Sequence, residues 1–119
     1  MDKDLTQIHA TVTRGCVTAR FCAPHVQEPG QVQKIAQEIM YLAQECRPKR
    51  FILTFAGVSH LTSAFLAKLV TLNRDLRKNG VELRLCDMNE ETARAFRLCK
   101  LHRIIKLFAT EEEAAQPAP

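Results

Sequence analysis

The sequence has no tryptophan, only four glycines and no long apolar segment. A membrane-spanning helix needs roughly 20 consecutive apolar residues, so we expect no membrane insertion. The polar N-terminus, MDKDLTQ, is followed by no apolar stretch of the kind that a secretory signal requires. We therefore expect a cytoplasmic protein.

Paired metal ligands and glycine-rich phosphate loops are also missing. The five cysteines are odd in number and scattered, and no CxxC pair occurs. This favours reduced thiols, and we expect no metal, no cofactor and no disulfide. Cys16, Cys22 and His25 match no zinc-ligand spacing. His60 has no cysteine or aspartate at a triad spacing, so we expect no enzymatic activity.

The charge of the chain is mildly positive, at +4. Five basic residues recur at every third position near the C-terminus: Arg94, Arg97, Lys100, Arg103 and Lys106. No aromatic residues are interleaved in a binding pattern, and basic residues also complement the negative end of a helix. We interpret these residues as a solvated face and expect no nucleic-acid binding.

What the sequence does contain is a regular alternation of strand and helix patterns. Four strands are predicted at Ile8–Thr13, Cys16–Phe21, 51–56 and 81–85, with a short last strand at 104–108. Arg14 and Gly15 read as a tight hairpin turn between the first two. The segment 51–56, FILTFA, is nearly all apolar and indicates a central strand covered on both faces. In 81–85, Glu82 and Arg84 alternate with apolar residues and predict one polar face.

Helical periodicity predicts three helices, at residues 31–46, 63–79 and 89–99. The segment CAPHVQEPG before the first helix is predicted to be loop. The order β β α β α β α β implies an α/β fold with a mixed, largely parallel sheet of about five strands and helices packed on it. We expect a single domain over residues 1–110 and a C-terminal tail over 111–119 that begins as a helical turn.

The segment 51–85 reads FILTFAGVSHLTSAFLAKLVTLNRDLRKNGVELRL. It contains, in this order, a buried strand, a glycine turn, a hydroxyl-bearing loop, a helix, a glycine that ends the helix, and a further strand. In this order of elements the chain resembles the STAS domain family, whose bacterial single-domain members include the anti-sigma factor antagonists. The family pattern has Gly-Val, then Asp-Ser-Ser-Gly-Leu-Gly at the start of a helix. Here it stands as Gly57-Val58, then Thr62-Ser63-Ala64-Phe65-Leu66-Ala67. Thr62 replaces the motif's aspartate, Phe65 and Ala67 replace its glycines, and Thr54 replaces an aspartate that many members carry.

This resemblance implies a regulatory module that switches partners. In the family, the serine after the motif's aspartate is phosphorylated by a kinase that is also an anti-sigma factor, and here that position is Ser63. The unphosphorylated domain then binds the anti-sigma kinase and frees a sigma factor, while the phosphorylated form lets go. A phosphatase is a further expected partner, and the domain itself is expected to be a monomer or weak dimer.

The expected partner-binding surface lies where two predicted strands end, because α/β folds place ligands at the carboxyl ends of parallel strands. It comprises Val58, Ser59, His60, Leu61, Thr62, Ser63, Ala64, Phe65, Leu66, Asp87, Met88 and Asn89. We also predict that Ser63 acts as the N-cap of its helix, since serine accepts a hydrogen bond from a first-turn amide.

A second class of function stays open at this point. Some STAS domains belong to anion transporters or lipid-transport complexes, and nucleotide binding is reported for the family. The alternative is therefore a STAS subunit that binds a nucleotide, an anion or a lipid, or an adaptor in a transport or stress-signalling complex.

Overall fold

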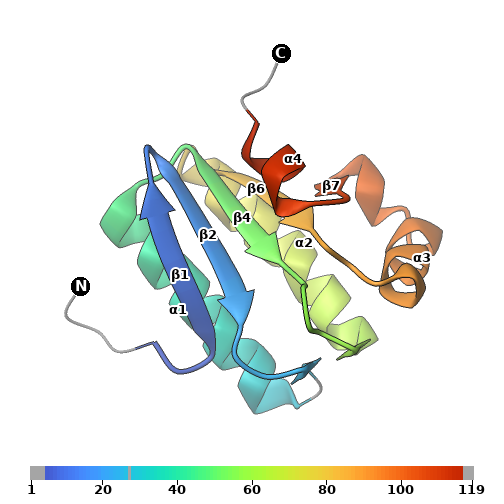
Figure 1. Ribbon diagram of the computed structural model, residues 1–119. Coiled ribbons are helices and arrows are strands. Elements are labelled where there is room, and N and C mark those ends of the chain that lie inside the picture. Colours follow the sequence, from blue (N-terminus) through green and yellow to red (C-terminus); the bar gives the residue numbers. More distant parts are fainter. Residues whose placement is uncertain (1–4, 27, 117–119) are drawn as a thin grey trace.

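A five-stranded sheet forms the centre of the molecule, in the order β1-β2-β4-β6-β7. The computed structural model describes residues 5–26 and 28–116. The strands are β1 (Ile8–Thr13), β2 (Cys16–Phe21), β4 (Arg50–Thr54), β6 (Glu82–Cys86) and β7 (Lys106–Phe108). Only β1 and β2 pair antiparallel, and every other pairing in this sheet is parallel. The prediction of a mixed, largely parallel sheet of about five strands is confirmed (Figure 1).

The β1–β2 hairpin turns at the two predicted residues. Arg14 has φ 44° and Gly15 has φ 77°. Positive φ at both central residues is what a tight two-residue hairpin requires, because its twist then matches that of the strands.

Helices α1 (Pro29–Cys46) and α2 (Ser63–Lys78) cover one face of the sheet (Figure 1). The apolar stripe of each helix packs against inward-facing side chains of β2, β4 and β6 and forms the main core. Helix α1 begins two residues earlier than predicted, because Pro29 fits the first helical position, where no amide is needed. It ends at Cys46 and is capped by Arg47, whose φ of 44° is left-handed.

A buried carboxylate on α1 fixes the start of β1. Glu38 is buried, and its two oxygens accept hydrogen bonds from the amides of Thr6, Gln7 and Ile8 at 3.0 to 3.2 Å. The Thr6 hydroxyl donates to the same carboxylate at 2.9 Å. Four donors therefore compensate the cost of burying this charge.

The opposite face of the sheet is covered only in part, by the short helix α4 (Glu111–Ala115). Figure 1 shows α4 lying over β4 and β6, while β1 and β2 stay uncovered on this side. Ala114 is buried against Ile52 and Cys86. This part of the predicted tail therefore packs on the domain. Residues 117–119 of the tail, and Gln27 of the predicted loop, lie outside the described residues.

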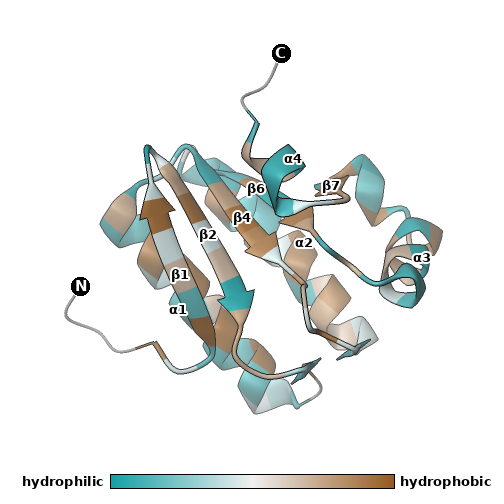
Figure 2. Ribbon diagram, in the orientation of Figure 1, coloured by the Kyte–Doolittle hydropathy of each residue, from teal (hydrophilic) through white to brown (hydrophobic). Residues whose placement is uncertain are grey.

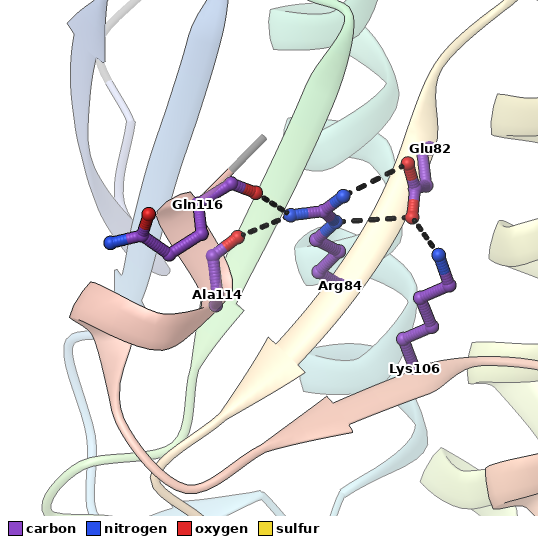
Figure 3. A network of polar contacts seen from close by, with 5 residues as sticks. All are labelled: Glu82, Arg84, Lys106, Ala114 and Gln116. Carbon is purple, nitrogen blue, oxygen red and sulfur yellow. Dashed lines mark hydrogen bonds and ion pairs between the residues drawn. The ribbon is translucent and has the colours of Figure 1, made fainter. Parts of the chain in front are cut away.

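Arg84 lies on the predicted polar face of β6, but it is buried. Its exposed fraction is 2%, because α4 covers it. Its guanidinium donates to the Glu82 carboxylate at 3.0 Å, to the Ala114 carbonyl at 2.9 Å and to the Gln116 carbonyl (Figure 3). Alternation along the strand could place Arg84 on this face, but it carried no information about a helix 30 residues further on.

Glu82 also forms an ion pair with Lys106, whose Nζ lies 3.4 Å from Oε2 of Glu82. Partial burial of Glu82 works to raise its pKa, but hydrogen bonds and charge attraction from Arg84 and Lys106 outweigh burial and lower the pKa. Because this pKa is lowered, the ionised Glu82 carboxylate stabilises the fold at pH values above the ordinary carboxyl pKa. This stabilisation is lost as the pH falls through the lowered value.

Two further elements complete the fold, α3 (Glu90–Leu98) and a 3-10 turn at Leu101–Arg103. A separate two-stranded parallel sheet joins β3 (His25–Val26) to β5 (His60–Leu61). Both segments were predicted to be loop, and this prediction is wrong, because two-residue strands are too short for any periodicity to show. Figure 2 shows apolar residues on the sheet and on the helix surfaces that face it.

We expect Arg84→Met to lower the free energy of unfolding by about 2–3 kcal/mol, since hydrogen bonds from a buried charged donor are lost and two carbonyls lose their partner. Lys106→Gln is the matched control, because Lys106 is mostly exposed and its surface pair should contribute less than about 1 kcal/mol. Urea unfolding of both variants checks this. Equal losses in the two variants would show that α4 is not held by the buried guanidinium.

Candidate functional site

The loops that follow β4 and β6 lie side by side at the carboxyl ends of these two strands. The Asn89 side-chain amide donates to the carbonyls of Val58 and Ser59, at 3.3 and 3.4 Å. The Thr54 hydroxyl at the end of β4 donates to the Asp87 carboxylate at 3.1 Å. The structure therefore brings together the two sequence segments, 58–66 and 87–89, that were expected to share one surface.

Thr62, and not Ser63, is the N-cap of α2. The Thr62 hydroxyl accepts a hydrogen bond from the Phe65 amide at 3.2 Å, and its backbone is extended. The prediction that Ser63 caps the helix is wrong: the helix begins one residue earlier than a Ser63 cap would require, so Ser63 is its first helical residue. Threonine suits the cap position because its hydroxyl reaches the free amide three residues on.

Ser63 is exposed in the first turn of α2. Its hydroxyl is not needed for capping and makes no side-chain hydrogen bond within residues 5–26 and 28–116. It lies at the positive end of a 16-residue helix. This end favours negative charge, so an anionic group attached there is electrostatically compatible with the domain.

The remaining members of the expected surface fall into two layers. Ser59, His60, Ala64 and Asn89 are exposed, and Leu61, Thr62, Asp87 and Met88 are half-buried. By contrast, Val58, Phe65 and Leu66 are buried and lie beneath the surface.

Phe65, which replaces a glycine of the family motif, is fully buried in an aromatic cluster. Its ring lies 5.7 Å from that of Phe21 and 6.3 Å from that of Phe55, both edge-on. Edge-to-face packing of this kind stabilises the core beyond the area that it buries. The first turn of α2, with Ser63 on its outer side, is therefore anchored by Phe65 on its inner side.

Two residues that the sequence reasoning missed, Pro24 and His25, border the same surface. The His25 and His60 rings stack at 5.3 Å, in register across the β3–β5 pair. The Ser59 hydroxyl lies 3.4 Å from the Pro24 carbonyl. The local sequence could not predict this contact, because it joins residues that are 35 positions apart.

The chemistry of the site is that of an exposed hydroxyl without a general base. No hydrogen bond joins Ser63 to His60 or Asp87 in the described part of the chain. Burial raises the pKa of the neighbouring Cys86 thiol to about 12, so this thiol stays protonated at neutral pH. Across the described ranges there is also no cluster of three or more metal-ligating side chains, and no helix there is long and apolar enough to cross a membrane.

Comparison with known proteins identifies the family. The family model of the STAS domain matches residues 29–114, and the chain belongs to this family. A putative anti-sigma factor antagonist from Thermotoga maritima has the same fold, with a TM-score of 0.75 at 18% identity, over 90% of each chain.

Two further solved structures share the fold. The phosphorylated form of the Bacillus cell fate determinant SpoIIAA matches with a TM-score of 0.66 at 21% identity, over 90% of this chain and 95% of that one. The murine anion transporter Slc26a9 matches with a TM-score of 0.68 at 16% identity, over 87% of this chain but only 18% of the transporter. At these identities the likeness concerns the fold, and the chain is a STAS domain.

The assignment of the cap gives a direct prediction. We expect Thr62→Ala to lower the free energy of unfolding by about 1 kcal/mol, whereas Ser63→Ala should change it by less than about 0.5 kcal/mol, as for other surface positions. Thermal and urea unfolding of the two single variants measure this difference. If Ser63→Ala lowered the free energy of unfolding more than Thr62→Ala does, Ser63 and not Thr62 would be the N-cap.

Proposed function

We propose that this domain is a partner-switching regulator of the anti-sigma factor antagonist type. The unphosphorylated domain binds an anti-sigma factor that is also a serine kinase, and phosphorylation of Ser63 ends the complex. The observation that carries the proposal is the position of Ser63. Its hydroxyl is exposed at the start of α2 in a STAS domain, and it does not cap the helix.

The separation of cap and phosphoacceptor supports this role. Because Thr62 provides the cap, Ser63 can be modified without loss of the hydrogen bond that begins the helix. The phosphate would meet first-turn amides and the positive end of the helix, so the domain tolerates it. The family's aspartate at position 62 is thus replaced by a residue that keeps the capping function.

The same charge acts in the opposite sense on a bound partner. A phosphate adds a charge of about −1.5 to −2 at neutral pH. Ser63 lies among Ser59, His60 and Ala64, with Asn89 beside the loop, so the charge falls within the proposed interface. There it must be desolvated, and repulsion from acidic groups of the partner adds to that cost. Phosphorylation therefore lowers affinity for the partner without unfolding the domain.

We further propose that the domain is a binding module, acts in the cytoplasm as a monomer or weak dimer, and has no catalytic activity of its own. A phosphatase would restore the binding form. The missing general base at Ser63 and the protonated Cys86 thiol support the absence of catalysis.

A second candidate is a ligand-binding or adaptor subunit of a transport complex. The structural likeness to part of Slc26a9 favours it, and at 16% identity this likeness concerns the fold alone. The two candidates differ in whether Ser63 is modified.

The test uses candidate kinases of the anti-sigma type encoded in the same genome, incubated with ATP and each variant. We expect phosphate at Ser63 in the wild type and none in Ser63→Ala. Ser63→Asp should weaken binding of that kinase at least tenfold, because a charge enters the interface. The matched control is Ser63→Asn. Asparagine has almost the same shape as aspartate but no charge, so this variant should bind nearly as the wild type does.

Phosphosite mapping and titration calorimetry provide the readouts. If none of the kinases modifies Ser63, and Ser63→Asp binds as tightly as Ser63→Asn, the switch is refuted and the adaptor remains.

A further inference from the structure

The uncovered half of the sheet carries a groove that the proposed switch does not use. It lies on the outer face of β1, β2 and β4, beside α4, and Arg50 and Thr54 from the two ends of β4 both line it; its volume is about 880 Å³. Figure 1 shows this face open, on the side of the sheet opposite to α1 and α2. The groove runs along the strands, and the Ser63 loop follows the carboxyl end of β4.

The charge of the groove is strongly one-sided. Arg14, Arg20 and Arg50 line it, and Glu111 is the one carboxylate among its lining residues. None of these three arginines has an ion pair in the described part of the chain, in contrast to Arg84, which the domain neutralises internally.

Arg50 adds evidence of a different kind. Its Nε is the one buried side-chain nitrogen or oxygen, within residues 5–26 and 28–116, that has no hydrogen-bond partner. Leaving a charged donor desolvated and unpaired is costly, and such a group calls for an explanation. Arg50 also lines the groove, so a ligand there would supply the acceptor that its guanidinium lacks within the domain.

The floor of the groove is rich in hydroxyl groups. Thr11 and Thr18 are cross-strand partners on β1 and β2, and both line the groove. Short side chains let another chain approach closely, and threonine hydroxyls can bond to its backbone. The lining residues include no phenylalanine, tyrosine or tryptophan, and the imidazole of His9 is the one aromatic ring among them.

The spacing of the arginines suggests the form of the ligand. Arg50 is in register with Cys16, and Arg20 lies four residues further along β2. Four residues of strand span about 13 Å. In an extended peptide, residues i and i+4 are separated by the same distance and point to the same side, whereas i and i+3 point to opposite sides.

We propose that this groove binds an extended acidic peptide segment of a protein partner, with two carboxylates four residues apart that pair with Arg50 and Arg20. Guanidinium groups suit this role because they bind carboxylates through two parallel hydrogen bonds. The site would give the domain a second docking surface, independent of Ser63.

The experiment compares two fluorescein-labelled peptides of equal composition, built from serine and threonine with two glutamates. In one the glutamates stand at i and i+4, in the other at i and i+3. Polarisation titrations with the full chain should show at least tenfold tighter binding of the i, i+4 peptide. Arg20→Gln and Arg50→Gln should each weaken it at least fivefold.

Three controls keep the outcome specific. Arg94→Gln removes the same charge from exposed α3 and should leave binding unchanged. Arg50→Lys keeps the charge but loses the fork and Nε, and should still weaken binding. Ser63→Asp should bind the peptide as the wild type does, so failure of the switch and failure of the groove are distinguishable.

Equal affinity for the two peptides, or an equal loss in Arg94→Gln, would mean unspecific charge attraction and would overturn the proposal. No binding of either peptide would overturn it as well. Thermal midpoints of the arginine variants, measured alongside, separate a lost contact from a lost fold.

Discussion

The structure depends on the burial of β4 between two parallel neighbours. β4 pairs with β2 on one side and β6 on the other. Phe51, Ile52 and Leu53 have no exposed surface, since α1 and α2 cover one face and α4 the other. A strand that is bonded at both edges and covered on both faces leaves little freedom to the residues that follow it. The segment that leads to Ser63 begins directly after this strand, at Phe55.

This constraint explains how an exposed serine can be held in a defined place. Phe65 is locked into the core by Phe21 and Phe55, and Thr62 fixes the start of α2. The backbone on both sides of Ser63 is therefore positioned by buried groups, and the hydroxyl itself is left outside. In the proposed switch, structure and regulation rest on adjacent residues, and a change at Ser63 is expected to act on what binds the domain more than on the fold.

Much of the fold could be predicted from the sequence because its signals are local. The apolar run at Phe51, the positive-φ turn at Arg14-Gly15 and the helical stripes all act within a few residues. What escaped prediction involves long-range contacts. Arg84 is buried by a helix 30 residues away, and β3 pairs with β5 across 35 residues. The cap was misassigned because Thr62 and Ser63 both suit it by residue type, and only the hydrogen bond from the Phe65 amide to the Thr62 hydroxyl tells them apart.

The central claim is that a charge at Ser63 acts locally, on the partner surface, and leaves the rest of the domain as it is. The most direct measurement compares amide ¹H–¹⁵N spectra of the domain with serine and with genetically incorporated phosphoserine at position 63. The account predicts shift changes confined to residues 58–66 and 87–89 and the adjoining His25, with β1, β2 and α4 unchanged. Shifts that spread through the sheet to α4 would contradict it, because the phosphate would then act by rearranging the fold.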